Sequence, residues 1–419
     1  MRYVFLLTCF LCFFCLLTVC FPQISAAQAP VASDQTATAR AATAVNAFAI
    51  DVYRQLATES GNLFFSPYSI SSALAMTYAG ARGDTAAEMA ETLHFNSCEP
   101  EIHAAMKALQ DRFNSIPNEA GSLDVANRLW LDKREKLTPD YSALVEKNYE
   151  AGVETVDFFN AYKIVRLEIN DWVALKTRDK IKDLLKEDNV TPATKLILVN
   201  AIYFNSAWLL PFDKADTREE PFHTDRGVQK IVPMMSRIGR FLYGENPEMQ
   251  WLKIPYKMPD FSMLILLPKE NGLFTQVEEL EKKLTVDTLA SWIDGMKPSR
   301  VALRMPKFKD ERRYPLADVL KKLGMKLAFT NDADFSGMVE KPTVDGYSLH
   351  IDYVIHQSFI ELDEERTEAA AATVVGMVRA TGMVEPEPII EFNADRPFIY
   401  CLTDDQTGTV LFMGRMAQP

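Results

Sequence analysis

Residues 364–383 read EERTEAAAATVVGMVRATGM, and the first half of this stretch consists almost entirely of small side chains. Glu and Ala favour a helix, which would cover 367–377 on the surface, whereas the Val374-Val375 pair and Gly376 weaken its continuation. The EPEP sequence at 385–388 then forces an extended exit. The stretch can therefore be helical or extended at little cost. A switching segment needs this property, because its two states must differ only modestly in local free energy.

The rest of the chain carries enough apolar sequence for a large core. Of its 419 residues, 48% are hydrophobic and 24% are charged, and no linker, charge block or internal repeat interrupts it after about residue 45. We therefore expect a single domain over 30–419. Helices come first, then interleaved strands and helices, then strands, and this order favours an α+β class over a doubly wound one.

The spacing of apolar residues predicts the individual elements. Helical spacing predicts helices over 41–56, 69–79, 85–93, 170–185 and 316–323, the third opened by a capping box of Thr85 and Glu88. Short runs rich in branched or aromatic residues predict strands at 62–65, before the Ser66-Pro67 break, and at 125–131, 196–204 and 262–267.

The N-terminus has the pattern of an export signal. Arg2 is followed by an uncharged run over 4–21, and Ala27-Gln28-Ala29 suits a signal peptidase. We expect a signal peptide over 1–29 and a secreted, periplasmic or extracellular protein without stable membrane association. An uncleaved anchor and lipidation at Cys20 are the alternatives, the first because the run is just long enough to span a bilayer.

Cysteine usage gives no disulfide framework. Four of the six cysteines lie in the leader, which leaves Cys98 and Cys401 in the mature chain. Two cysteines so far apart in sequence are expected to be buried free thiols. The fold must therefore be stabilised by its core.

Charge and motifs argue against several classes of protein. The formal net charge of −12 gives no support to a nucleic-acid partner or an anionic membrane surface. Nucleophile-elbow, dinucleotide, phosphate-loop and zinc-protease motifs do not occur, so we expect no enzyme, metal or cofactor. The five histidines are scattered: His94, His103, His223, His350 and His356. A hydrolase with catalytic residues dispersed in sequence and a static scaffold protein are the alternatives from other classes.

Several separate stretches resemble the serpin family, in order and at the family's spacing. They are NLFFSPYSI at 62–70, LVNAIYF at 198–204 followed by Trp208, PKF at 306–308 and FNADRPFIY at 392–400. The resemblance covers nearly the whole mature chain, from about Asn46 to Pro419. It implies three β-sheets, about nine helices and an exposed reactive-centre loop over about 364–389.

The resemblance also implies a function and its site. In that family a serine protease attacks one bond of the loop and forms a covalent acyl-enzyme. The cut loop then inserts into the large sheet and deforms the protease. The chain would be a monomeric suicide-substrate inhibitor of serine-type endopeptidases. Asn200 and Trp208 would lie in the region where the sheet opens.

The predicted hinge suits insertion with one exception. It comprises Glu364, Arg366, Thr367, Glu368, Ala369, Ala370, Ala371, Ala372 and Thr373. In a strand, the small residues at 367, 369, 371 and 373 share one face, and Glu368 lies on the opposite, solvated face with Arg366 and Ala370. The family's usual glycine is replaced by Arg366, so slower insertion is expected. A non-inhibitory serpin, a binding protein or plain protease substrate, is the alternative.

The position of the scissile bond decides the target. Counting seventeen residues from Glu364 places it at Ala380-Thr381, which suits elastase-like or subtilisin-like proteases. Arg379-Ala380 would suit a trypsin-like enzyme, whose specificity pocket carries a carboxylate. Met383 is a third, weaker candidate.

Two surface features complete the sequence. Asn189-Val190-Thr191 is a glycosylation tripeptide if the source is a eukaryote. Four basic residues alternate along one segment and form either a modest basic patch or an ordinary solvated helix surface: Lys176, Arg178, Lys180 and Lys182.

Overall fold

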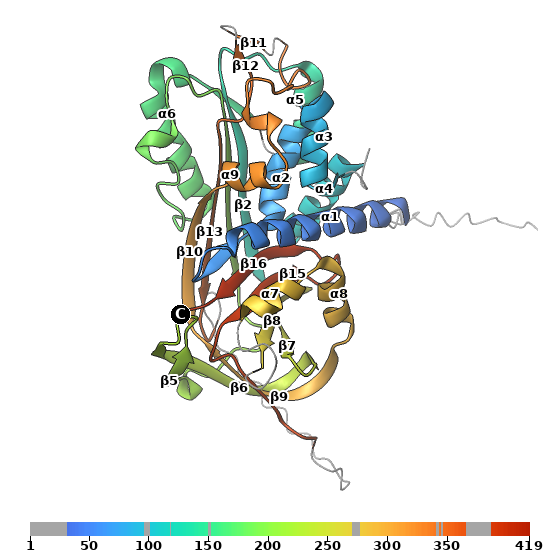
Figure 1. Cartoon of the computed structure of the whole chain (residues 1–419), viewed down its shortest axis with the longest axis vertical. Coiled ribbons are helices and arrows are strands. Elements are labelled where there is room, and N and C mark those ends of the chain that lie inside the picture. Colours follow the sequence, from blue (N-terminus) through green and yellow to red (C-terminus); the bar gives the residue numbers. More distant parts are fainter. Residues whose placement is uncertain are drawn as a thin grey trace, which may run out of the picture.

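The computed structural model describes residues 32–95, 101–117, 119–149, 152–269, 277–340, 343–344, 347–365 and 387–419 (Figure 1). The predicted leader, Cys20 and Cys98 lie outside the described residues. So does most of the predicted loop, including the hinge residues 366–373, Arg379, Ala380, Thr381 and Met383.

The described residues form nine α-helices. They are α1 (Ala32–Leu56), α2 (Pro67–Tyr78), α3 (Gly83–Thr92), α4 (Ile102–Asn114), α5 (Pro139–Tyr149), α6 (Phe158–Lys176), α7 (Val277–Lys283), α8 (Val286–Asp294) and α9 (Ala317–Lys322). The start of α2 shows how local sequence sets these bounds. The Ser66 hydroxyl accepts a hydrogen bond from the Ser69 N–H, and Pro67 occupies the first turn, where a missing N–H costs nothing.

Three sheets are present among the described residues. The five-stranded sheet has the order β10 (Phe308–Pro315), β13 (Tyr353–Leu362), β4 (Leu196–Ser206), β2 (Gly121–Asp132), β3 (Val153–Val156). The nine-stranded sheet has the order β1 (Leu63–Phe65), β16 (Val410–Met416), β15 (Phe398–Asp404), β8 (Phe261–Pro268), β7 (Met249–Pro255), β6 (Gln229–Glu245), β9 (Lys297–Pro306), β14 (Ile390–Asn393), with β5 (Arg218–His223) paired to β6. The third pairs β11 (Thr343–Val344) with β12 (Tyr347–Ser348).

Helices cover both faces of the five-stranded sheet, with α6 on one side and α2 on the other (Figure 1). The strand β4 is therefore buried along nearly its whole length. Leu198, Ile202 and Phe204 join the core cluster on the α2 side, whereas Val199 and Tyr203 join the cluster beneath α6. This period-2 division explains the continuous apolar run in the sequence.

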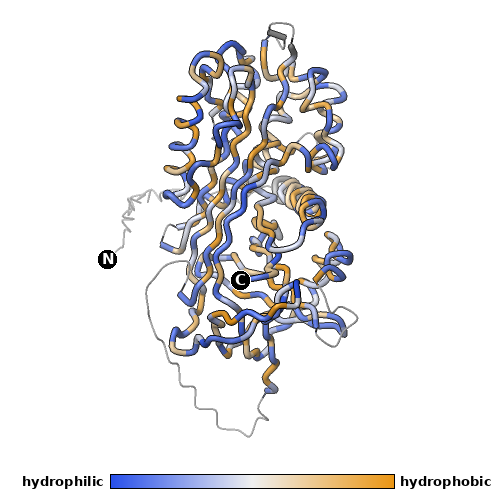
Figure 2. The backbone as a smooth tube through the Cα atoms, turned by 60° about the vertical axis from the view of Figure 1, so that its left-hand side comes forward, coloured by the Kyte–Doolittle hydropathy of each residue, from blue (hydrophilic) through white to orange (hydrophobic). Residues whose placement is uncertain are grey.

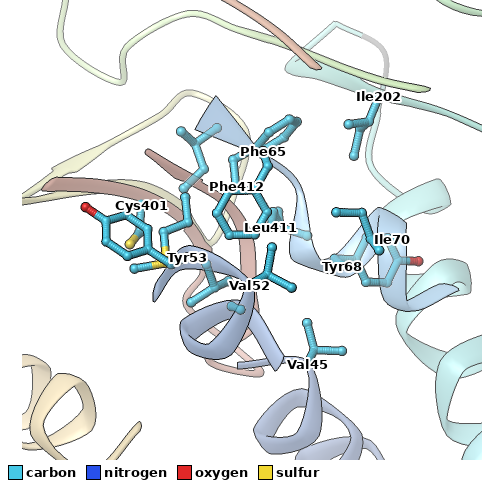
Figure 3. Packing of buried hydrophobic residues seen from close by; sticks show 14 of the residues in the cluster. Val45, Val52, Tyr53, Phe65, Tyr68, Ile70, Ile202, Cys401, Leu411 and Phe412 are labelled. Carbon is cyan, nitrogen blue, oxygen red and sulfur yellow. The ribbon is translucent and has the colours of Figure 1, made fainter. Parts of the chain in front are cut away.

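The main core lies where α1 and α2 pack against the nine-stranded sheet (Figure 3). Val45 and Val52 of α1 face Leu411 and Phe412 of β16, and all four are buried. The strands at the centre of both large sheets are mostly hydrophobic (Figure 2), and β4, β8, β15 and β16 are buried along nearly their whole length. Cys401 of β15 is a buried free thiol, as predicted, and burial raises its pKa to about 12.

Most of the expected elements are confirmed. The strands predicted at 125–131, 196–204 and 262–267 are β2, β4 and β8, each slightly longer than predicted. The first, second and last predicted helices are α1, α2 and α9. The α+β class is therefore confirmed.

The helix predicted over 170–185 was wrong in its bounds. It is the second half of α6, which begins at Phe158 and ends at Lys176. The helix stops because Arg178 and Asp179 adopt positive φ angles of 51° and 60°. Apolar residues continue at helical spacing beyond this point, and that spacing misled the prediction.

The predicted capping box of α3 was also wrong. The Thr85 hydroxyl accepts a hydrogen bond from the N–H of Asp334 at 3.0 Å. The Glu88 carboxylate accepts the N–H groups of Lys326 and Leu327, both at 2.7 Å. These side chains tie α3 to the chain that follows α9, a tertiary role that the local pattern does not reveal.

Candidate functional site at the open end of the five-stranded sheet

The centre of the five-stranded sheet is a parallel pair of strands that separates at one end. Residues 353–359 of β13 pair with 197–203 of β4, and this ladder stops at Tyr203 and Phe359. Both strands continue beyond that point, β4 paired with β2 as far as Ser206 and β13 paired with β10 as far as Leu362. At this end β4 and β13 are therefore no longer paired with each other, but each is still paired with its outer neighbour. Parallel pairing is slightly weaker per residue than antiparallel pairing, and this seam is the parallel ladder at the centre of the sheet, the other being β2–β3 at its edge.

The chain that leaves β13 at the open end is held by its backbone. The indole N–H of Trp208 donates to the carbonyl of Asp363 at 2.9 Å, and the N–H of Phe212 donates to the carbonyl of Glu364 at 2.8 Å. Trp208 is buried and stacks on Tyr256, with the ring centroids 4.5 Å apart. The start of the predicted loop is thus attached to the segment that follows β4.

Side-chain contacts fix the same point. The carboxylate of Glu364 is buried, lies 2.8 Å from Lys307 Nζ and accepts a hydrogen bond from the Thr217 hydroxyl at 2.8 Å. Burial alone would raise the pKa of the Glu364 carboxyl, but these two donors outweigh it and hold the pKa below its ordinary value. Glu365 forms an exposed ion pair with Lys214 at 2.7 Å. The buried anchor is therefore Glu364, and beyond it the contacts are at the surface.

Farther from the open end, a buried polar cluster crosses the parallel seam between β4 and β13. It consists of Ser66, Ser69, Asn127, Asn200 and His356, contributed by the start of α2 and by β2, β4 and β13. Asn200 and His356 are register partners in the parallel ladder, and the ring Nδ1 of His356 hydrogen-bonds the side-chain oxygen of Asn200. Asn200 Nδ2 in turn donates to Ser69 Oγ at 2.6 Å and to Asn127 Oδ1. The hydrogen bond between the side chains of Asn200 and His356 therefore joins β4 to β13, the two strands that separate nearer the open end.

The partners of His356 set its charge. Its Nε2 accepts the N–H of Ser66 at 3.0 Å, so the ring proton must be on Nδ1, which donates to Asn200. A second proton on Nε2 would face the N–H of Ser66. Complete burial lowers the pKa of His356 to about 3. The ring is therefore neutral at physiological pH.

A family model described as Serpin (serine protease inhibitor) matches residues 43–419. The chain belongs to the serpin family. Serpins as a family are protease inhibitors rather than catalysts, and they target serine proteases.

The relatives of this serpin come from distant organisms. It is 40% identical over 376 residues to an uncharacterized serpin-like protein of Thermococcus kodakarensis, covering 90% of this chain and 85% of that protein. It is 37% identical over 378 residues to a leukocyte elastase inhibitor of Xenopus laevis, covering 89% and 97%. Among solved structures, human thyroxine-binding globulin matches with a TM-score of 0.79 at 31% identity, covering 91% and 99%.

The structure brings only part of the predicted site of this serpin into view. Asn200 lies in the polar cluster, Trp208 lies at the open end, and Glu364 lies beside Trp208. The partners Lys307 and His356 were missed as functional residues. The signals for them were the PKF stretch at 306–308, which contains Lys307, and an asparagine in an otherwise apolar strand, because a buried amide requires partners that sequence alone cannot name.

The basic segment after α6 is paired with acidic groups. Arg178 lies 2.9 Å from Asp124, Lys180 lies 3.6 Å from Glu361, and Lys182 lies 3.6 Å from Asp179. The part of the chain that the structure describes therefore offers no concentrated basic patch there, and three of the four residues lie beyond the end of the helix.

The described residues offer neither a metal-binding cluster nor a membrane-spanning helix. They contain no group of three or more His, Cys, Asp or Glu side chains placed to hold a metal ion. No helix among them is long and apolar enough to cross a membrane. The amide oxygen of Asn189 accepts a hydrogen bond from Arg313 at 2.6 Å.

Proposed function

We propose that this serpin inhibits serine-type endopeptidases by suicide-substrate trapping. The protease attacks a bond within 366–386 and forms an acyl-enzyme, and the cut segment then inserts between β4 and β13. The observation that carries the proposal is the seam between these strands, which is already separated where the chain turns at Glu364. A strand that continues from Glu364 needs only to extend this separation.

Insertion has identifiable costs and gains. The inserting strand must break the bond between Asn200 and His356 and the short parallel ladder. In return it forms ladders on both of its edges, with β4 and with β13, and both are antiparallel. The hinge sequence supports this path, because the small residues at 367, 369, 371 and 373 share the face that would meet α2, and a large or charged side chain there would have to be buried.

We further propose Ala380-Thr381 as the scissile bond, with Arg379-Ala380 as the second candidate. The similarity to a leukocyte elastase inhibitor supports a target that accepts small apolar side chains. Cleavage at Arg379 would keep the mechanism and change the target to a trypsin-like enzyme. An elastase-like or subtilisin-like protease is therefore the proposed partner.

A non-inhibitory role is the second candidate. Arg366 stands where glycine is usual in the hinge, and the similar human thyroxine-binding globulin is named for binding a small molecule. In that case the loop would be cut as a plain substrate. Neither role requires the chain itself to be a catalyst.

We also propose that residues 1–29 are removed on export and that the mature inhibitor is the single domain 30–419. N-terminal sequencing of protein recovered outside the producing cell tests this. A new N-terminus near Pro30 supports the proposal, whereas retention of Met1 or modification at Cys20 contradicts it.

The test of function mixes the mature protein with active trypsin and with active elastase. A covalent complex that survives a denaturing gel, with mass spectrometry placing the cut after Ala380 or Arg379, is the expected result. Thr367→Arg is the matched control, because it places a charge on the face to be buried and should turn the inhibitor into a substrate without affecting the bond that is cut. Cleavage of the wild-type protein without a complex would contradict inhibition.

A further inference from the structure

A face of the nine-stranded sheet next to the end of the loop combines exposed arginine and aliphatic side chains. We call it the β6–β9 face, and it consists of Ile238, Arg240 and Leu242 on β6 with Arg300 and Arg304 on β9. Ile238 is 56% exposed and Leu242 is 43% exposed. The alternate residues of the same strands, such as Phe241 and Leu303, are buried. The apolar residues of this face are therefore not part of the core.

The arginines of this face lower the stability of the sheet, because two of them lie opposite each other. Arg240 and Arg300 are directly opposite each other in the antiparallel β6–β9 ladder. Like charges in that position are about 5 Å apart at Cβ and destabilise the pair. Arg240 has an ion pair with Glu387 at 2.9 Å, but within the described residues the guanidinium groups of Arg300 and Arg304 make no hydrogen bond or ion pair. The ion pair with Glu387 therefore offsets only part of the repulsion, and a local arrangement that costs stability is typical of a functional surface.

The strands that carry this face and their neighbours have a net positive charge, opposite in sign to that of the whole protein, although Glu391 of β14 lies in register beside the face. The strands β5, β6, β9 and β14 together carry seven Lys and Arg residues and four Asp and Glu residues, in a chain with a formal net charge of −12. Such a local field attracts an acidic partner and orients it before contact.

The location of the face points to the partner. The described chain resumes after the loop at Glu387, which is ion-paired with Arg240, and then enters β14 beside β9. The chain therefore returns to the protein at the edge of this face, at the end of the molecule opposite β11 and β12 (Figure 1). A protease that holds the C-terminal part of the loop would place its own surface against these side chains.

We propose that the β6–β9 face is a second contact surface for the target protease, and that it selects enzymes with an acidic, partly apolar surface beside the active-site cleft. The inference rests on the proposed inhibitory function and adds a determinant of target choice outside the loop. Ile238 and Leu242 favour a protein over a sulfated polysaccharide, because a protein surface buries the aliphatic groups between the arginines whereas a polyanion leaves them in water.

The test measures encounter binding separately from the cleavage chemistry. Anionic and cationic forms of trypsin and of elastase, each with the catalytic serine replaced by alanine, are immobilised, and association rate constants are measured for three proteins. These are the wild type, the double variant Arg300→Glu/Arg304→Glu, and the control Lys322→Glu/Lys326→Glu. The control makes the same charge change at exposed positions on α9 and just after it.

We expect the double variant to associate with an anionic enzyme at least about tenfold more slowly at low salt, whereas the control associates at the wild-type rate. The difference should shrink at high salt, where screening weakens the attraction. Arg300→Ser should reduce the rate in the same direction and should unfold no earlier than the wild type, because it removes a like-charge contact. It replaces the double variant if that protein fails to fold.

The inference is wrong if the two double variants associate with the anionic enzymes at equal rates, or if the wild type binds none of the inactivated enzymes. It is also wrong if Arg300→Glu/Arg304→Glu loses binding to heparin but associates with the proteases at the wild-type rate, because the face would then be a polyanion site. The covalent complex with active enzymes is scored separately. Face-dependent binding without any covalent complex would refute the inhibitory function and leave the surface in place. If the double variant and the wild type form the covalent complex at the same rate, the inhibitory function stands and the second contact surface is refuted.

Discussion

At the scale of single residues, His356 makes two hydrogen bonds that can form together only while its ring is neutral. Its Nδ1 must donate to Asn200 across the seam, and its Nε2 must accept from the N–H of Ser66 at the start of α2. A positively charged ring would lose the second contact and would be buried without a counter-ion. The stability of the closed sheet is therefore linked to pH.

The sign of this linkage follows from the pKa. The pKa of His356 is about 3 in the fold, against about 6.5 in the unfolded chain. Between these values the unfolded chain binds a proton more readily, so the contribution of His356 to stability is complete above about pH 6.5 and is lost as the pH falls. We expect the loss to reach up to about 1.4 kcal/mol per pH unit. Thermal unfolding from pH 7 to pH 5 measures it.

Two variants isolate the residue responsible. His356→Gln should be less stable at pH 7 but should lose less stability toward pH 5 than the wild type does. His223→Gln, at an exposed histidine of β5, is the control for loss of a histidine elsewhere in the chain. An unchanged slope in His356→Gln would show that another group controls the acid response.

Arg366 is the second residue with a specific consequence. In an inserted strand its side chain would lie on the solvated face, so its cost is one of hinge conformation rather than burial. We expect Arg366→Gly to speed insertion, because glycine adopts turn conformations that arginine resists. Fewer inhibitor molecules should then be consumed per protease inactivated, with the number falling toward one in a titration of residual activity.

Arg366→Lys, which keeps a charged side chain without the conformational freedom of glycine, should behave as the wild type. An equal improvement in both variants would assign the effect to the guanidinium group.

At the scale of elements, sequence reasoning succeeded where local spacing and core position agree. The continuous apolar run of β4 reflects burial on both faces, and the Ser66-Pro67 break starts α2 as expected. It failed where tertiary contacts decide. Helix α6 ends at residues with positive φ, and Glu88 binds the chain after α9 rather than its own helix. Local patterns do not encode such partners.

The same limit applies to the site. The sequence indicated Glu364, Asn200 and Trp208, but it gave no sign that Lys307 is the counter-ion of Glu364. It also could not show that the β4–β13 ladder stops below the open end, because strand pairing joins residues far apart in the chain. The separated seam is therefore a finding that only the structure provides.

The seam makes a direct prediction about mechanism. Tyr203 and Phe359 form its last register pair, and their ring centroids are 5.8 Å apart. A disulfide in Tyr203→Cys/Phe359→Cys should lock β4 to β13, prevent insertion and turn the inhibitor into a substrate, with covalent complex restored by reduction. Denaturing gels with the target protease, before and after reduction, measure this. In protein that begins at Pro30, a Cys98→Ser background leaves only the buried Cys401 besides the introduced pair.

A second cross-link controls for the introduction of a disulfide. Asp124 is the register partner of Tyr203 on the other side, so Asp124→Cys/Tyr203→Cys joins β4 to β2 without crossing the seam. This variant should still form the covalent complex when oxidised. If both cross-links abolish the complex, opening between β4 and β13 is not the specific requirement.

At the scale of the whole molecule, the described contacts show an arrangement in which the five-stranded sheet is left incomplete at its centre. Covering helices bury both faces of β4, the anchor at Glu364 fixes one end of the loop, and the ion pair between Arg240 and Glu387 holds the chain on the far side. Under the proposed mechanism, the segment between these two points can add a central strand to this sheet only after it is cut. The uncleaved fold should therefore be less stable than the cleaved one.

Cleavage alone should release this stability, whichever enzyme makes the cut. We expect nicking of the loop by papain, a cysteine protease, to raise the midpoint of thermal unfolding, since a gain of ~5 kcal/mol in a domain of this size corresponds to about 6 °C. Thr367→Arg, cut in the same way, should gain far less, because its hinge must bury a charge to insert. If the nicked variant gains as much as the nicked wild type, the gain comes from relief of the loop rather than from a new central strand. If neither gains, the fold is static, and its loop has no part in a change of the sheet.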